Sequence, residues 1–459
     1  MRSLHRAEKR RVWLRAWAVG SFVLGAGLLY SQQPGSSSDV RTGTTSGLDA
    51  DARIQNLLAT HEFFRIQALL DTLPREDAEL YRGILANRNN DLKGSIQILE
   101  PLLDRVVASG NKAHEKLLRK ALAEDYLRTG DWAKASAAYQ TLDTRLHMQL
   151  SADEKDEIEL PLKLLPMAAA NPPMTVDSFE PFTLQLSKNP LGLFDLPVFV
   201  DARPHSWMLD PTAPFNLISR SLAREVGLRV SDQATVIHTL TGRKMEVHAT
   251  VIPRFTLGGH ITFHNMTAFV FEDRDYYFPK TRHQVQGVLG YPALSTVGTM
   301  TITDEDNFEV QPRTGKRLPA LNSRPPQGTR FFFDGDQMIV ALGKPGDERM
   351  AAIDEGGQQT YMTSRYYEEH SREFANKKME LFSIPGADTR PPEPAYMAES
   401  IPLVVGTNTV QLHYLQVLTQ PLGSAVLDDV YGILGIDALD QLRAYTFDFE
   451  NMRFSIKPE

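Results

Sequence analysis

The chain has 459 residues, a formal net charge of −8 and a hydrophobic content of 42%. This length predicts two or three domains, and the hydrophobic content is ordinary for globular proteins. The charge is mild and forms no basic stripe, which argues against a nucleic-acid partner. Cysteine is absent, which excludes disulfides, thiolate metal sites and a cysteine nucleophile.

The first thirty residues have the pattern of a targeting segment. Basic residues from Arg2 to Arg15 precede an apolar run from Ala16 to Tyr30. A charged start before such a run is typical of a signal peptide or, if it is not cleaved, of a membrane anchor. Residues 1–31 are therefore predicted to send the rest of the chain across the cytoplasmic membrane, to be periplasmic, secreted or anchored. Residues 32–47, rich in Ser, Gly and Thr, are expected to be a flexible tether.

Residues 48–145 have apolar side chains at helical spacing. Turn signals at 89–91 and 129–131 lie about 40 residues apart, a period typical of repeated helical hairpins. One unit resembles the tetratricopeptide (TPR) pattern, through Tyr126, Gly130, Trp132, Ala135 and Tyr139. Stacked hairpins of this kind usually bind a protein partner or bury against their own chain. A helical scaffold without a ligand is an equal alternative.

Residues 146–178 change in composition from a charged stretch to an Ala- and Pro-rich one, and they are predicted to be a linker. After them the pattern becomes short alternating runs, as in 196–200 and 247–251, which is typical of β-strands. The sequence therefore predicts an α+β multidomain chain, in which N-terminal α-helical hairpin repeats precede a mainly β part.

The β part consists of two copies of one sequence unit. Gly-Val-Leu-Gly at 287–290 recurs as Gly-Ile-Leu-Gly at 432–435, Ala-Leu at 293–294 recurs at 438–439, and Ser-Arg at 219–220 recurs at 364–365. The residue numbers in all three pairs differ by 145. One shared offset indicates a tandem duplication, with lobe 1 at residues 179–318 and lobe 2 at residues 326–459.

An aspartate ends an apolar run in each copy, at Asp210 and at Asp354. Packing of two such units about a pseudo-twofold axis would bring both carboxylates to one seam. Carboxylates at close range share a proton and titrate in two separate steps. Such a dyad can deprotonate a water while it protonates a substrate carbonyl oxygen, which is acid–base hydrolysis. The plainer alternative is that each aspartate only caps its turn.

These motifs resemble the retropepsin-like and pepsin-like aspartic proteases, whose lobes each carry Asp-Thr/Ser-Gly and a later apolar-apolar-Gly. The resemblance implies a two-lobed protease-like fold in one chain, catalytic Asp210 and Asp354, a polypeptide substrate or peptide ligand, and no cofactor. It also implies substrate-cleft residues, which include a flap hairpin at residues 239–242. The cleft candidates are Thr212, Ala213, Gly356, Gly357, Thr241 and Gly242.

Both aspartate motifs depart from the family pattern. In the family, the hydroxyl after each aspartate bonds across the dyad and holds it rigid. Pro211 supplies neither a hydroxyl nor an N–H, Glu355 supplies no neutral donor, and Thr212 stands where the family has glycine. Two functions stay open: an extracytoplasmic aspartic endopeptidase with weakened hydrolysis, or a protease-like protein without hydrolysis that binds peptides or acts as a scaffold.

Other chemistries have little support. The sequence has no HExxH motif, phosphate loop, nucleophile elbow or dinucleotide fingerprint. His260 and His264 share one face of a stretch with a β pattern, which by itself indicates no metal site. We therefore expect neither a metal ion nor a cofactor.

Overall fold

The computed structural model describes residues 47–238, 244–315, 328–335, 337–344, 346–384, 391–422 and 428–457. The predicted leader at 1–31 and nearly all of the predicted tether lie outside these residues. Residues from Ser46 onward form one compact unit. Within the described ranges, no helix combines the length and the hydropathy needed to cross a bilayer.

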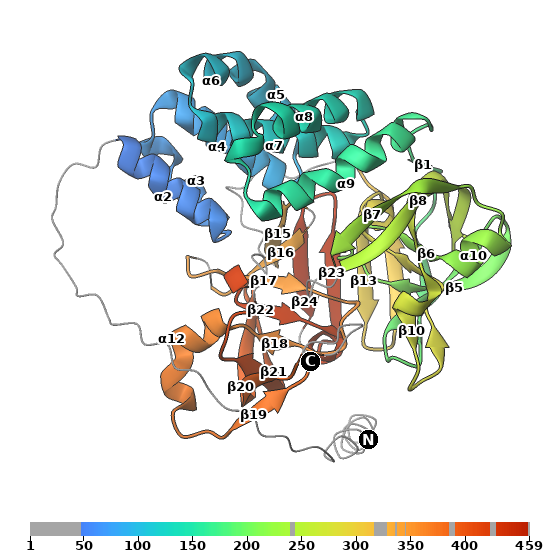
Figure 1. Ribbon diagram of the computed structural model, residues 1–459. Coiled ribbons are helices and arrows are strands. Elements are labelled where there is room, and N and C mark those ends of the chain that lie inside the picture. Colours follow the sequence, from blue (N-terminus) through green and yellow to red (C-terminus); the bar gives the residue numbers. More distant parts are fainter. Residues whose placement is uncertain are drawn as a thin grey trace. The chain divides into compact units, whose positions relative to one another are not determined.

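The first described segment is helical (Figure 1). The turns predicted at 89–91 and 129–131 separate α4 from α5 and α7 from α8, and the side chains of Asp91 and Asp131 cap the following helices. Gly130 ends α7 with φ 77°, a left-handed conformation that favours glycine. An N-terminal helical region is thus confirmed, whereas its TPR assignment stays a prediction. The helices are α2 (Gly47–Ala59), α3 (Phe63–Leu69), η1 (Leu70–Thr72), α4 (Arg75–Arg88), α5 (Leu92–Leu99), η2 (Glu100–Leu102), α6 (Leu103–Ser109), α7 (Lys112–Thr129), α8 (Trp132–Arg145), η3 (His147–Gln149) and α9 (Ala152–Ala169).

The linker predicted at 146–178 is wrong for much of its length, because it contains α9. Pro161 and Pro166 lie within this helix, although proline lacks the N–H that a helix interior requires. Ile158 and Leu165, two turns apart, are nevertheless buried in the hydrophobic cluster of the helical region. Burial of this apolar face outweighs the weak local preference.

The β part forms two lobes that share a common order of elements. Lobe 1 contains β1 (Thr175–Val176), β2 (Phe182–Gln185), β3 (Ser187–Lys188), β4 (Phe194–Val200), β5 (Arg203–Leu209), β6 (Leu217–Ser219), α10 (Arg220–Glu225), β7 (Val230–His238), β8 (Lys244–Leu257), β9 (Ile261–Phe271), η4 (Asp273–Tyr276), β10 (Tyr277–Phe278), β11 (His283–Gln284), β12 (Gly287–Leu289), α11 (Tyr291–Leu294), β13 (Thr299–Thr303) and β14 (Asn307–Gln311). Lobe 2 contains β15 (Thr329–Asp334), β16 (Gln337–Leu342), β17 (Arg349–Ile353), β18 (Tyr361–Met362), α12 (Ser364–Phe374), β19 (Met379–Phe382), β20 (Glu393–Val405), β21 (Asn408–Leu418), β22 (Gly432–Leu434), α14 (Ile436–Leu439), β23 (Ala444–Asp448) and β24 (Arg453–Lys457). To the common order, lobe 1 adds β1, β3, η4, β10 and β11.

Strand pairing confirms the duplicated fold. In lobe 1, β12 runs parallel to β5 and antiparallel to β6; in lobe 2, β22 runs parallel to β17 and antiparallel to β18. The lobes join through antiparallel β13 and β23, where Thr301 lies opposite Thr446. These residues are 145 positions apart, and their hydroxyl oxygens are 2.8 Å apart. A residue that pairs with its own copy marks the position of the pseudo-twofold axis.

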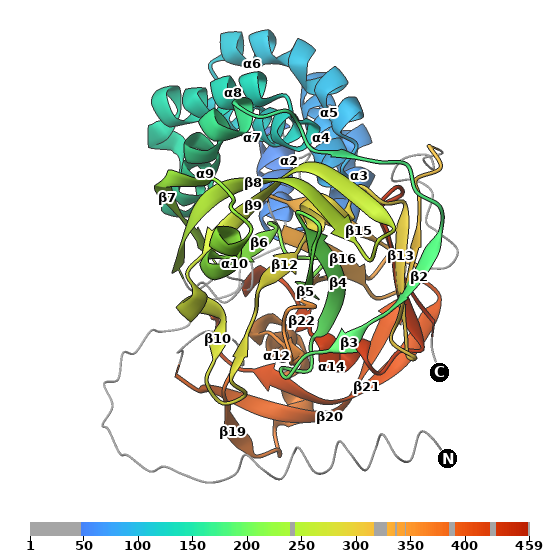
Figure 2. The ribbon, with the colours of Figure 1, turned by 90° about the vertical axis from the view of Figure 1, so that its right-hand side faces the viewer.

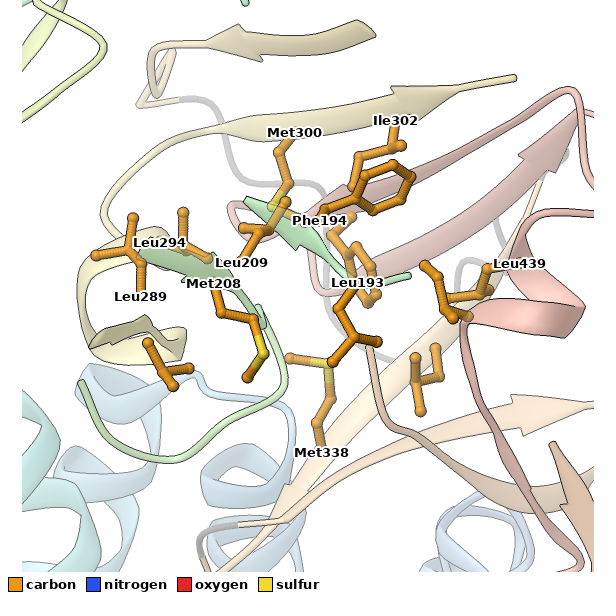
Figure 3. Close-up of a cluster of buried hydrophobic side chains, with 14 of the residues drawn as sticks. Leu193, Phe194, Met208, Leu209, Leu289, Leu294, Met300, Ile302, Met338 and Leu439 are labelled. Carbon is orange, nitrogen blue, oxygen red and sulfur yellow. The ribbon is translucent and has the colours of Figure 1, made fainter. Parts of the chain in front are cut away.

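One hydrophobic core runs beneath both lobes. Figure 3 shows Met208, Leu209 and Leu289 of lobe 1 in one cluster with Met338 and Leu439 of lobe 2. Met208 and Leu209 directly precede Asp210, so packing of this core fixes the strand end that presents the aspartate.

Lobe 2 is also covered by the helical region. The run Phe331–Phe333 in β15 is buried on both faces: Phe331 and Phe333 belong to the β core, whereas Phe332 belongs to the cluster of the helices. The Phe332 ring lies 4.9 Å from that of Phe63 in α3. Figures 1 and 2 both show β15 beside the helices.

Candidate active site

Asp210 lies directly after β5. Its backbone N–H donates to the carbonyl of Leu289 in the neighbouring parallel strand (3.1 Å). Its Oδ1 accepts hydrogen bonds from the Thr212 N–H (3.1 Å), the Thr212 hydroxyl (2.7 Å) and the Ala213 N–H (3.1 Å). Asp210 is buried, and these three donors favour its charged form.

Asp354 has the equivalent place after β17. Its backbone N–H donates to the carbonyl of Leu434 (2.9 Å). The backbone N–H groups of Gly356 and Gly357 favour the charged form of its carboxyl. Asp354 is partly exposed, unlike Asp210. Solvent can therefore reach this carboxylate.

The two carboxylates meet at Gly356. A Cβ at this glycine would lie 2.5 Å from Asp210 Oδ2 and 3.4 Å from Asp354 Oδ1. Both oxygens are thus near one point, which limits their separation to less than about 6 Å, within the range of strong charge coupling. At Gly357, a Cβ would lie 2.4 Å from Asp354 Oδ2. Only glycine leaves room for the carboxylates at these two positions.

The two carboxyl groups of the dyad differ in proton affinity. Desolvation raises the pKa of Asp354 to about 7, and the negative charge of Asp210 contributes to the rise. Desolvation also raises the pKa of Asp210, although its bonds to Thr212 and Ala213 oppose the rise. Because Asp210 has the stronger set of donors, the shared proton is favoured on Asp354.

A second pair of residues supports the site, and the sequence analysis missed it. Asn216 Oδ1 accepts from the N–H of Gly290 (3.0 Å), and Thr360 Oγ1 accepts from the N–H of Gly435 (2.8 Å). Each polar side chain thus ties the turn after an aspartate to the glycine that ends the neighbouring strand. Asn216 and Thr360 lie six positions after the two aspartates, so the offset that pairs the aspartates could have found them.

Four of the six predicted cleft residues lie beside the dyad, and two lie outside the described residues. Thr212, Ala213, Gly356 and Gly357 surround the carboxylates, as described above. Thr241 and Gly242 lie outside the described residues. The hairpin that leads to them is formed by β7 and β8.

Two cavities in the described part of the chain lie away from the dyad. A cavity of about 330 Å³ is lined by Glu62, Phe64, Arg65 and residues 346–350. A smaller one of about 110 Å³ is lined by Asp195, Ser206, Met208 and residues 283–286. The substrate cleft over the dyad therefore stays a prediction. No group of three or more described His, Cys, Asp or Glu side chains is placed to hold a metal ion.

Comparison with known proteins relates lobe 1 to proteases. Residues 196–293, which contain Asp210, match the family described as aspartyl protease. No curated protein sequence matches the chain. Together with the strand pairing described above, the match supports an aspartic-protease-like fold.

Solved structures with some similarity are distant. A retropepsin-like aspartic protease from Rickettsia conorii has 17% identity and a TM-score of 0.22, over 29% of this chain and 94% of that one. An aspartic proteinase from Irpex lacteus has 12% identity and a TM-score of 0.39, over 61% of this chain and 97% of that one. Basic 7S globulin from soybean has 10% identity and a TM-score of 0.38, over 61% of this chain and 95% of that one.

Proposed function

We propose that the chain is an aspartic endopeptidase that hydrolyses peptide bonds with the Asp210/Asp354 dyad. The observation that carries the proposal is the meeting of the two carboxylates at Gly356, with the shared proton favoured on Asp354. Adjacent carboxyl groups with different proton affinities can act as base and acid in one step.

In the proposed reaction, Asp210 takes a proton from a bound water, and the water oxygen forms a bond to the peptide carbonyl carbon. Asp354 gives its proton to the carbonyl oxygen, which yields a neutral gem-diol. The proton now on Asp210 then passes to the amide nitrogen as the C–N bond breaks. A gem-diol hydroxyl returns its proton to Asp354, so the dyad ends with the single proton that it had at the start.

The pH dependence follows from this assignment. Activity requires Asp354 to be protonated, so it should fall as pH rises through the Asp354 pKa of about 7. It also requires Asp210 to be ionised, so it should fall again in acid. The rate should therefore be bell-shaped with pH.

The test is an assay of the purified full chain on an unfolded protein between acidic and neutral pH. Asp210→Asn and Asp354→Asn should each abolish cleavage, whereas Asp232→Asn, at an exposed position, should cleave as the wild type does. Equal cleavage by the wild type and both dyad variants would exclude the dyad from the mechanism.

A second function is favoured by the residues that follow the aspartates. Pro211 has no N–H, and the Glu355 carboxyl has no hydrogen-bond partner among the described residues, so the dyad is less rigidly held than in the family. If peptides bind without cleavage in every variant, the chain is a protease-like peptide-binding or scaffold protein.

We also propose that the first 31 residues export the chain. The basic start and the apolar run that follows it support this proposal. Residues 1–46 fused to a reporter enzyme that is active only outside the cytoplasm should give activity. Loss of that activity when Arg10 and Arg11 are replaced by glutamate would support export, and an inactive unaltered fusion would contradict it.

The helical region is proposed to hold TPR-like hairpins that bind a protein partner. In the unit that best fits the pattern, Ala135 and Tyr139 are buried and Trp132 is partly buried. The face toward lobe 2 is occupied, because Arg88 pairs with Asp334 (2.9 Å) and Asn89 accepts from Arg330 (3.0 Å). A partner would therefore bind another face, and cross-linking from exposed Lys134 should capture it. Cross-links confined to lobe 2 would contradict this proposal.

A further inference from the structure

Glu355 is a buried acid with an unusual environment. Its side chain is 1% exposed, and neither carboxyl oxygen has a hydrogen-bond partner among the described residues. It directly follows Asp354, in the seam between the lobes. An ionised carboxylate in such a place is strongly disfavoured, so a buried acid without a partner normally keeps its proton.

The duplication shows that this acid is particular to one lobe. The equivalent position after Asp210 holds Pro211, which has no titratable group. The seam therefore contains three carboxyl groups rather than the two of a symmetric dyad: Asp210, Asp354 and Glu355. If all three were ionised, three negative charges would lie in one partly desolvated site.

The groups that face Glu355 oppose its ionisation. Desolvation raises its pKa well above the ordinary value, and the negative charges of Asp210, Asp440 and Asp354 raise it further. The opposing contribution comes from the hydroxyl of Tyr445 on β23. Tyr445 is itself buried, and its hydroxyl has no aligned hydrogen-bond partner in the described chain. No cation is among the principal groups that act on Glu355.

We propose that Glu355 is present as a neutral acid that fills the seam beside Tyr445 and leaves the three carboxyl groups with a single negative charge. The inference rests on the proposed function for its effect on catalysis, but its protonation state can be tested without any activity.

The first test is stability as a function of pH. A carboxyl whose pKa is raised by folding stays protonated in the folded state after the unfolded chain has lost its proton. It therefore lowers stability as pH rises above the unfolded value of 4.5. Glu355→Gln and Glu355→Met in the full chain both remove this penalty. Relative to the wild type, the folding equilibrium of each should improve about tenfold per pH unit above that value.

Glu450→Gln is the matched control. Glu450 is also buried, but its carboxylate accepts from the N–H and hydroxyl of Thr314 (2.9 and 3.0 Å). Desolvation raises the pKa of Glu450, but these bonds outweigh it and lower the pKa overall. Its stabilisation is present above pH 4.5 and is lost in acid, so Glu450→Gln should be less stable than the wild type at neutral pH and match it in acid.

The free energy of unfolding, measured between pH 4 and pH 8, distinguishes a neutral Glu355 from a residue that only fills space. A difference from the wild type that grows with pH, in the direction opposite to that of Glu450→Gln, supports a neutral Glu355. A difference that is constant with pH in both Glu355 variants would overturn the proposal. In that case Glu355 would only fill space.

The second test is the pH profile of cleavage. If Glu355 is neutral while the dyad works, Glu355→Gln should leave the alkaline limb of the rate in place. A shift of that limb to lower pH by about one unit would mean that an ionised Glu355 had been raising the Asp354 pKa, which would overturn the proposal. A wild type without activity would refute the proposed protease function and leave the stability test of Glu355 decisive.

Discussion

Replacing Gly356 with alanine would place a methyl group between the two carboxylates of the dyad. The new Cβ would lie 2.5 Å from Asp210 Oδ2, whereas ordinary van der Waals contact begins at 3.4 Å. Gly356 is not among the residues with positive φ, so alanine meets no backbone strain there. The substitution therefore perturbs the carboxylate positions and little else.

The magnitude follows from the geometry. The Asp210 oxygen or the 354–357 turn must move by about 1 Å, a displacement that costs about a hundredfold in rate. Crowding of this kind in a packed site also costs about 1–3 kcal/mol of the free energy of unfolding. The contact with Asp354 Oδ1, at 3.4 Å, needs little adjustment, so the base should be displaced more than the acid.

The assay compares cleavage of an unfolded protein by the wild type, Gly356→Ala and Gly94→Ala at pH 5–6. Gly94 is the control because a Cβ there would also lie 2.5 Å from a carboxylate oxygen, that of Asp91 in the helical region. Gly94→Ala should be fully active, since alanine favours the helix and Asp91 can turn toward solvent. If Gly356→Ala cleaves as fast as Gly94→Ala does, the dyad is not packed as the structure shows, or it does not perform the reaction.

Three other outcomes can be measured by denaturation. Arg88→Met removes the guanidinium that pairs with the buried Glu124 and with the partly buried Asp334 (2.9 Å to each), which should cost about 3–5 kcal/mol; a cost below about 1 kcal/mol, as for surface ion pairs, would contradict this. Desolvation raises the pKa of Glu115, but three basic side chains lower it overall to about 2. Stability from Glu115 should therefore be lost as pH falls from 4.5 to 2, and Glu115→Gln should lack this dependence. Thr446→Val removes the bond to Thr301 at the pseudo-twofold axis and should cost about 1 kcal/mol; an unchanged midpoint would contradict this.

Much of the candidate site could be predicted because the chain carries two copies of one unit. Repeated motifs at a constant offset indicate two equivalent folds, and packing of the two copies about one axis can bring the aspartates that end the same strand in each copy to one seam. The structure places Asp210 and Asp354 in this way, at equivalent strand ends. The same symmetry relates Asn216 to Thr360, although neither is a residue type that by itself indicates catalysis.

Local signals also located the helical hairpins, since Asp91, Gly130 and Asp131 act on neighbouring backbone groups. Local signals did not predict α9, whose two prolines oppose a helix locally. That helix is stabilised by Ile158 and Leu165 packing into a cluster built from distant parts of the chain. Helix propensity is a weak local preference that tertiary burial readily outweighs.

By itself the sequence determined the helical and β regions, the duplication and the two aspartates, because each depends on periodicity or repetition along the chain. The tertiary structure alone decided how the copies differ. Asp334 pairs with Arg88 of the helical region, whereas Asn189, 145 residues earlier, bonds within its own turn. Glu355 is buried beside Tyr445, 90 residues later in the sequence. Burial and charge at these positions depend on contacts between segments far apart in the chain, and a local sequence pattern does not predict such contacts.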